Sequence, residues 1–104
     1  MEVFHVNNRN KRSNPDHDLY KAVLMLDNVE KCYHFFEDLC TAAELKAMEQ
    51  RFEVAKLLDR GMIYNDILEE TGASSATISR VNRSLNYGRD AYREIFAKLE
   101  ETKK

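Results

Sequence analysis

The run from Thr71 to Arg83 contains, at close spacing, residue types that contact nucleic acids. It reads TGASSATISRVNR, with small and hydroxyl-bearing residues ahead of two arginines. Hydroxyl groups can hydrogen-bond to base edges or phosphates, and a small methyl group can pack against the methyl group of thymine. Arginine guanidinium groups can pair with phosphate oxygens. These residues therefore predict a segment that contacts DNA.

The same run has the turn chemistry of a helix-turn-helix, which we predict over about residues 64–83. Gly72 can adopt the left-handed conformation that ends the first helix. Ser74 or Ser75 can accept a hydrogen bond from the first free backbone amides of the second helix. Apolar residues on both sides of the turn can then pack into one small core, namely Ile67, Ala73, Ile78 and Val81.

The outward face of the second helix is predicted to read the major groove with its N-terminal residues. Small, uncharged side chains there allow close approach to base edges. An ordinary helical hairpin that packs on a neighbouring helix is the alternative, but it leaves unexplained the three arginines and the absence of acidic residues in 73–89. The residues predicted to contact DNA are Ser74, Ser75, Ala76, Thr77, Ser79, Arg80 and Arg83.

The charge distribution supports two hypotheses from different classes. The chain of 104 residues has a net charge of −2, whereas residues 73–89 carry +3 and residues 16–72 carry −7. Attraction to phosphates depends on the local face more than on the total charge, so a DNA-binding regulator is one hypothesis. A helical protein-interaction module that does not read DNA is the other, and salt-dependent binding to duplex DNA would distinguish them.

The sequence lacks the patterns of several other classes. It shows no nucleophile–base set, no carboxylate cluster at metal spacing and no phosphate-binding glycine loop, so we expect neither an enzyme nor a metal site. Cys32 and Cys40 form no CxxC pair and are predicted to be reduced. No apolar run is long enough to span a membrane and no signal peptide is evident, so we expect a cytoplasmic protein.

The composition favours an all-α fold, because three glycines and one proline leave few breaks in 104 residues. We expect a flexible, basic arm at 1–15, where Arg9, Lys11 and Arg12 could touch phosphates, and one helical domain at 16–104. Helices are predicted at 16–26, 29–39 and 89–101, and a long one follows the capping box Thr41–Glu44 and ends near Gly61. The apolar stripe of the long helix is predicted to be Leu45, Met48, Phe52, Ala55 and Leu58.

The segment 39–99 resembles the Trp repressor superfamily, and more closely its YerC/YecD branch. The resemblance implies a six-helix fold in which the helices of two chains interleave in an obligate homodimer. It also implies a transcriptional repressor on a roughly two-fold operator, with the recognition helices about one DNA turn apart. The matching strings are DLCT at 38–41, QRFEVA at 50–55, TGASSATISRV at 71–81 and LNYGRDAY at 85–92.

The resemblance also implies positions for an effector. Trp repressors bind tryptophan between two arginines, whose positions match Arg51 and Arg80, and Thr41 and Ser84 match positions that line the same pocket. The family has glycine directly after the second arginine, where this chain has Val81, and the branched side chain would occupy space that the indole needs. We therefore predict no cofactor, although tryptophan or another small effector stays an alternative.

A different role for the same two arginines needs no ligand. Arg51 and Arg80 could form ion pairs, for example with Glu49 or Glu53, or could contact phosphates directly.

Overall fold

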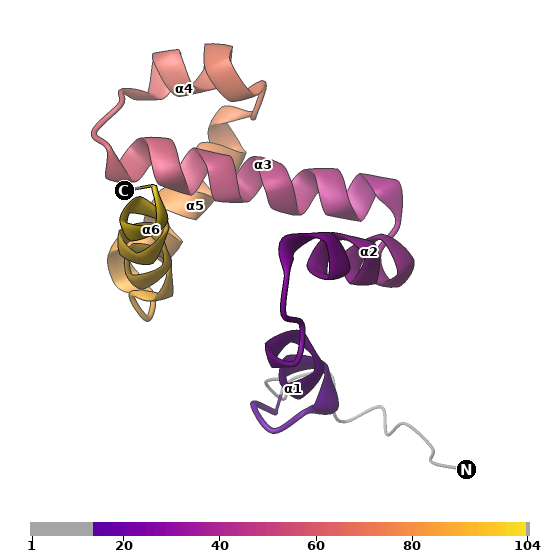
Figure 1. Cartoon of the computed structure of the whole chain (residues 1–104). Coiled ribbons are helices and arrows are strands. Elements are labelled where there is room, and N and C mark those ends of the chain that lie inside the picture. The colour runs from indigo at the N-terminus through magenta and orange to yellow at the C-terminus, as the bar shows by residue number, and fades with distance from the viewer. Residues whose placement is uncertain (1–13, 104) are drawn as a thin grey trace. The chain divides into compact units, whose positions relative to one another are not determined.

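The computed structural model describes residues 14–103, which form six α-helices and no β-strand. The prediction of an all-α fold is therefore confirmed. The described residues divide between Leu39 and Cys40 into two compact units. The arm predicted at 1–15 lies almost entirely outside the described residues, and the single domain at 16–104 stays a prediction. The helices are α1 (Asp18–Leu24), α2 (Val29–Leu39), α3 (Ala42–Asp59), α4 (Tyr64–Thr71), α5 (Ser75–Tyr87) and α6 (Ala91–Thr102) (Figure 1).

The first unit contains α1 and α2. Helix α1 is shorter than the predicted 16–26, because the His17 ring nitrogen Nδ1 accepts the Leu19 amide at 3.0 Å and caps the helix there. Neither helix buries a residue within this structure, although both carry large apolar side chains. Leu24 is 87% exposed and Val29 is 85% exposed. Helices with this much exposed apolar surface require a further surface against which to pack.

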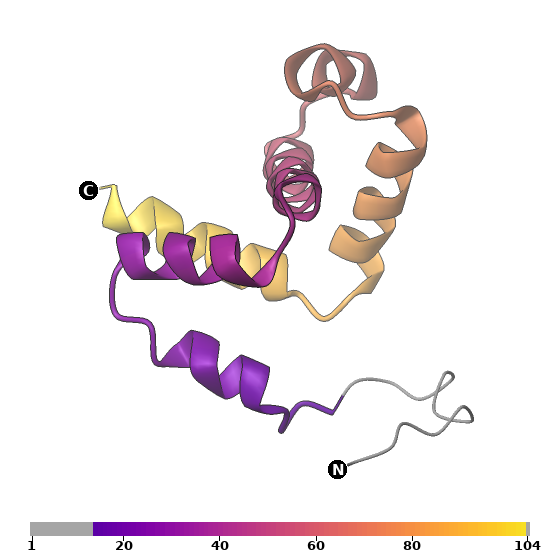
Figure 2. The ribbon, with the colours of Figure 1, turned by 90° about the vertical axis from the view of Figure 1, so that its right-hand side faces the viewer.

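The second unit is built around α3, the longest helix. The Thr41 hydroxyl accepts the Glu44 amide at 3.1 Å, and the Glu44 carboxylate accepts the Thr41 amide at 2.8 Å. The predicted capping box is therefore present, and the helix ends before Gly61, whose φ of 89° suits glycine. Helices α4, α5 and α6 all pack against α3, which passes between them in the view of Figure 2.

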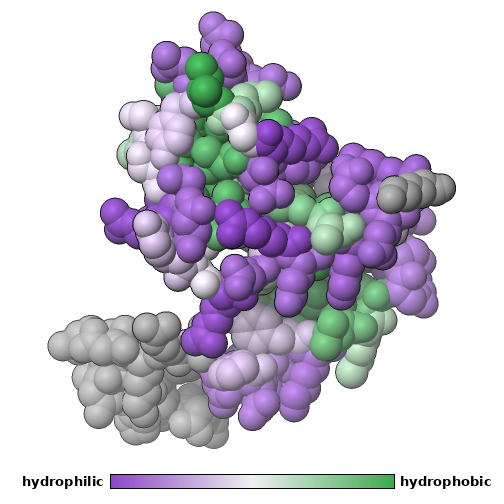
Figure 3. Space-filling model, turned by 90° about the vertical axis from the view of Figure 1, so that its left-hand side faces the viewer, coloured by the Kyte–Doolittle hydropathy of each residue, from purple (hydrophilic) through white to green (hydrophobic). Residues whose placement is uncertain are grey.

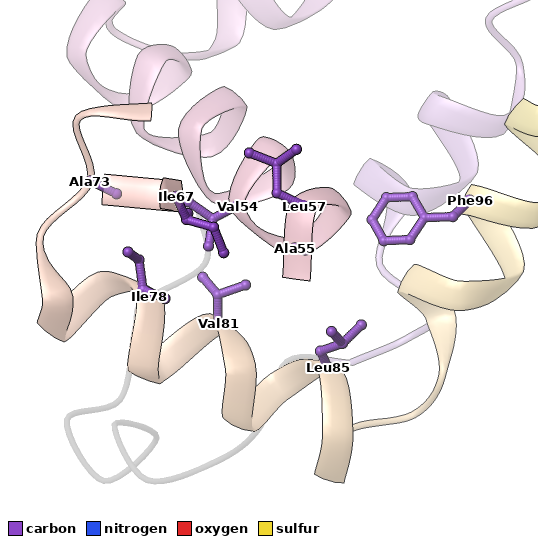
Figure 4. Close-up of a cluster of buried hydrophobic side chains, with 9 residues drawn as sticks. All are labelled: Val54, Ala55, Leu57, Ile67, Ala73, Ile78, Val81, Leu85 and Phe96. Atoms are coloured by element: carbon purple, nitrogen blue, oxygen red, sulfur yellow. The ribbon is translucent and has the colours of Figure 1, made fainter. Parts of the chain in front are cut away.

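The core of the second unit is entirely apolar (Figure 4). The four residues predicted to pack across the turn are all buried, which confirms the core of the helix-turn-helix. The predicted stripe of α3 is partly wrong: Phe52 is 36% exposed, whereas Val54 is fully buried. The reason is that α4 and α5 pack on the Val54 side, while Phe52 contacts α6 through Phe96, at a ring-centroid distance of 5.3 Å. The buried residues are Val54, Ala55, Leu57, Ile67, Ala73, Ile78, Val81, Leu85 and Phe96.

Two isoleucines near the start of the helix-turn-helix provide a matched test of this core. Ile67 is fully buried and Ile63 is 63% exposed. We expect Ile67→Ala to lower the free energy of unfolding by about 3 kcal/mol, because it removes buried methyl groups and leaves a cavity. The control Ile63→Ala should change it by less than about 0.5 kcal/mol. Urea unfolding at one fixed protein concentration measures both, and equal losses would contradict this assignment of the core.

Candidate nucleic-acid interface

The N-terminus of α5 is fixed by a serine cap. The Ser74 hydroxyl accepts the Thr77 amide at 3.1 Å and donates to the Thr77 hydroxyl at 3.1 Å. These two hydroxyls thus satisfy each other and one amide of the first turn. The other free amides and the positive end of the helix dipole remain available to an anion such as phosphate.

The outward face of α5 consists of Ser75, Ala76, Ser79 and Arg83, all of which are exposed. They lie opposite Ile78 and Val81, which are buried against α3. The separation follows from the helical period, because residues 78, 81 and 85 share one face and residues 75, 79 and 83 share another. Small side chains at the first turn leave the backbone accessible to a bulky polymer.

Three arginines lie on or next to α5. Arg80, Arg83 and Arg89 are exposed and form no ion pair within residues 14–103. In contrast, Arg93 of α6 pairs with Asp59 at 3.3 Å. Three cations left for an external anion therefore lie on or next to α5. The face of the molecule drawn in Figure 3 is mainly hydrophilic, with hydrophobic side chains in separate patches.

The turn between α4 and α5 has the predicted left-handed glycine. Gly72 has φ 71° and its amide donates to the Leu68 carbonyl at 2.9 Å. The Thr71 hydroxyl donates to the Ile67 carbonyl at 2.7 Å and accepts the Ala73 amide at 3.1 Å. The side chain of Gln50, on α3, donates to the Thr71 carbonyl at 3.2 Å.

Sequence reasoning did not find the roles of Gln50 and Thr71. The available signal for Gln50 was its position, because this polar residue lies four positions before Val54 and therefore on the side of α3 that is buried. A second polar connection was also missed, because it links three helices: Arg93 donates to Asn86 of α5 at 3.1 Å while it pairs with Asp59 of α3.

The four positions matched to an effector pocket have different surroundings. Arg51 and Arg80 are both exposed, and the Ser84 hydroxyl donates to the Arg80 carbonyl at 3.4 Å. The Thr41 hydroxyl is the cap of α3. Val81 is 2% exposed, and Figure 4 shows its side chain in the core with that of Ile78. An effector pocket at these positions stays the alternative to the prediction that no cofactor binds.

The ion-pair alternative for the two arginines is wrong within residues 14–103. Glu53 pairs with Lys56 at 3.2 Å, and neither Arg51 nor Arg80 has an acidic partner among the described residues. Both guanidinium groups are therefore free to interact with an external anion.

Within 14–103, no three His, Cys, Asp or Glu side chains gather in a way that could hold a metal ion. Cys32 and Cys40 are free thiols. None of the helices in this part of the chain is both long and apolar enough to cross a membrane.

Comparisons with known proteins agree on one family. Residues 16–100 match the family model described as Trp repressor protein. The chain is 51% identical over 84 residues to the uncharacterized protein YerC of Bacillus subtilis (strain 168), and the match covers 81% of each chain.

Two solved structures share the fold as well as the sequence. A candidate Trp repressor from Staphylococcus aureus is similar with a TM-score of 0.78 and 49% identity, over 80% of this chain and 83% of that one. A TrpR-like protein from Eubacterium eligens ATCC 27750 is similar with a TM-score of 0.77 and 54% identity, over 80% and 86%. These likenesses indicate a DNA-binding regulator and not a member of an enzyme family. The chain belongs to the Trp repressor family.

Proposed function

We propose that this protein is a homodimeric transcriptional repressor that binds a two-fold operator and inserts α5 into the major groove. One observation carries the proposal: the N-terminal half of α5 presents small, exposed side chains beside arginines that have no acidic partner in residues 14–103. A helix of this kind can approach base edges closely while the arginines neutralise phosphates.

Each part of the outward face has a role in this proposal. The hydroxyls of Ser75 and Ser79 hydrogen-bond to base edges or phosphates, and the Ala76 methyl group contacts thymine. Arg80 and Arg83 pair with phosphate oxygens and hold the helix in register. Ser74 and Thr77 contact the phosphate backbone of the DNA from the capped end of α5, where the helix dipole favours an anion.

The exposed apolar surface of the first unit supports the proposed homodimer. Neither α1 nor α2 has a buried residue, and the family match begins at residue 16 and includes both helices. A second copy would cover this surface and would bring a second α5 to the same DNA. A two-fold dimer binds two half-sites in opposite orientation, so the operator should be palindromic.

We propose further that DNA binding does not require tryptophan. The position after Arg80 is Val81, whose side chain is part of the core. A glycine at this position, as in the family, has no side chain and leaves that space open. Arg51 and Arg80 then act on phosphates and not on a ligand.

Ser74 allows its cap to be separated from its contact with DNA. Ser74→Asn keeps a good cap without adding charge, so stability and DNA affinity should both be retained. Ser74→Asp keeps the cap and suits the helix dipole, so stability should hold, but the carboxylate repels phosphates and should weaken DNA binding at least about tenfold. Thermal unfolding and fluorescence anisotropy on one duplex measure the two effects. Equal affinity of the Asn and Asp variants would place the N-terminus of α5 away from DNA.

Selection of genomic DNA fragments by the purified protein, with and without free tryptophan, tests the proposed function. We expect the same palindromic motif to be enriched in both arms, because Val81 replaces the glycine that tryptophan binding requires in the family. Enrichment only with tryptophan would contradict the effector part of the proposal. No motif in either arm would contradict sequence-specific binding and would favour the protein-interaction module.

A further inference from the structure

One hydrogen bond ties the helix-turn-helix to the long helix at the turn itself. The Gln50 side-chain amide of α3 donates to the Thr71 carbonyl at 3.2 Å, in a part-buried position. Thr71 is the last residue of α4, and its carbonyl has no partner within that helix. The contact joins residues that are 21 positions apart, so it depends on the relative placement of the two helices.

The turn beyond Thr71 is held by bonds that leave it little freedom. The Thr71 hydroxyl bonds both to the Ile67 carbonyl and to the Ala73 amide, and Gly72 closes the helix in the left-handed conformation. The segment from α4 to the cap of α5 is thus connected by successive short bonds. Any rotation of this segment on α3 would separate Gln50 from Thr71 and leave a part-buried amide and carbonyl unpaired.

We propose that Gln50 is a positioning residue for the recognition helix. Its amide fixes the turn on α3, and through the turn it sets the direction in which Ser75, Ala76 and Ser79 face the DNA. Recognition of base edges demands that side chains be held closely in place by a supporting layer of contacts, and Gln50 belongs to that layer. The inference rests on the proposed function, because it assigns Gln50 a part in DNA recognition.

The proposal predicts a loss of specificity rather than a general loss of binding. Binding to unrelated DNA depends mainly on the cations that neutralise phosphates, and Gln50 is uncharged. Binding to the preferred site depends also on base contacts, which need the correct orientation of α5. Loss of the Gln50 bond should therefore weaken binding to the preferred site and leave binding to other sequences unchanged.

Gln50→Leu removes the side-chain amide that donates to Thr71, while the side chain stays uncharged and about the same size. Met48→Leu is the matched control, because Met48 is also half-buried on α3 and makes no hydrogen bond to the turn. Gln50→Ala is the second variant if leucine does not fit. Fluorescence anisotropy measures Kd on a duplex with the selected motif and on a scrambled duplex, well below the unfolding temperature of each variant. Amide hydrogen exchange at Ala73 measures the freedom of the turn directly.

For Gln50→Leu we expect Kd on the selected duplex to rise about fivefold, which corresponds to one lost hydrogen bond, with Kd on the scrambled duplex unchanged. Exchange of the Ala73 amide should be faster, and Met48→Leu should match the unsubstituted protein in both assays. A merely structural role for Gln50 would lower the unfolding temperature without changing the ratio of the two Kd values, and would overturn the inference. Unchanged exchange at Ala73 would overturn it as well. If the unsubstituted protein binds both duplexes equally, sequence-specific binding fails, and the exchange rate still decides whether Gln50 fixes the turn.

Discussion

The burial of one face of α5 against α3 is the constraint on which the remaining features depend. Ile78, Val81 and Leu85 lie on one side of α5 and are buried with Val54 and Ala55 of α3. Because a helix buries only one side in such a contact, the opposite side must face outward. The exposure of the small residues of α5 is therefore a consequence of the apolar packing on its other side, and no further interaction is needed to explain it. The same contact holds α4 in place, since Ile67 belongs to the same cluster.

Electrostatics decides what kind of partner this outward face accepts. The chain as a whole is slightly acidic, yet no acidic residue lies in 73–89. Several cations away from α5 are paired: Arg93 bonds to Asp59, and Lys56 bonds to Glu53. Arg80 and Arg83 of α5 have no acidic partner among the described residues, and the capped end of the same helix also favours an anion. An acidic protein can in this way retain one surface with unpaired arginines.

Much of the fold could be predicted because its signals are local. Gly72 at the turn and the Thr41 capping box each act within a few residues, and the helix-turn-helix core has regular spacing. The buried face of α3 was predicted only in part. Periodicity identifies an apolar face of a helix, but it does not say which other helix packs on which side of that face. Phe52 and Val54 show the difference. The bond from Gln50 to Thr71 could not be predicted, because it depends on how two helices meet in space.

In the proposed complex, a two-fold pair of α5 helices occupies neighbouring major grooves of the DNA. Hydroxyl-radical footprinting on a duplex that the protein selects tests it most directly. We expect two protected regions on each strand, related by two-fold symmetry, with half-site centres about 34 Å apart, which is one turn of DNA. Protection of a single half-site at saturating protein, or two protected regions in the same orientation, would contradict it.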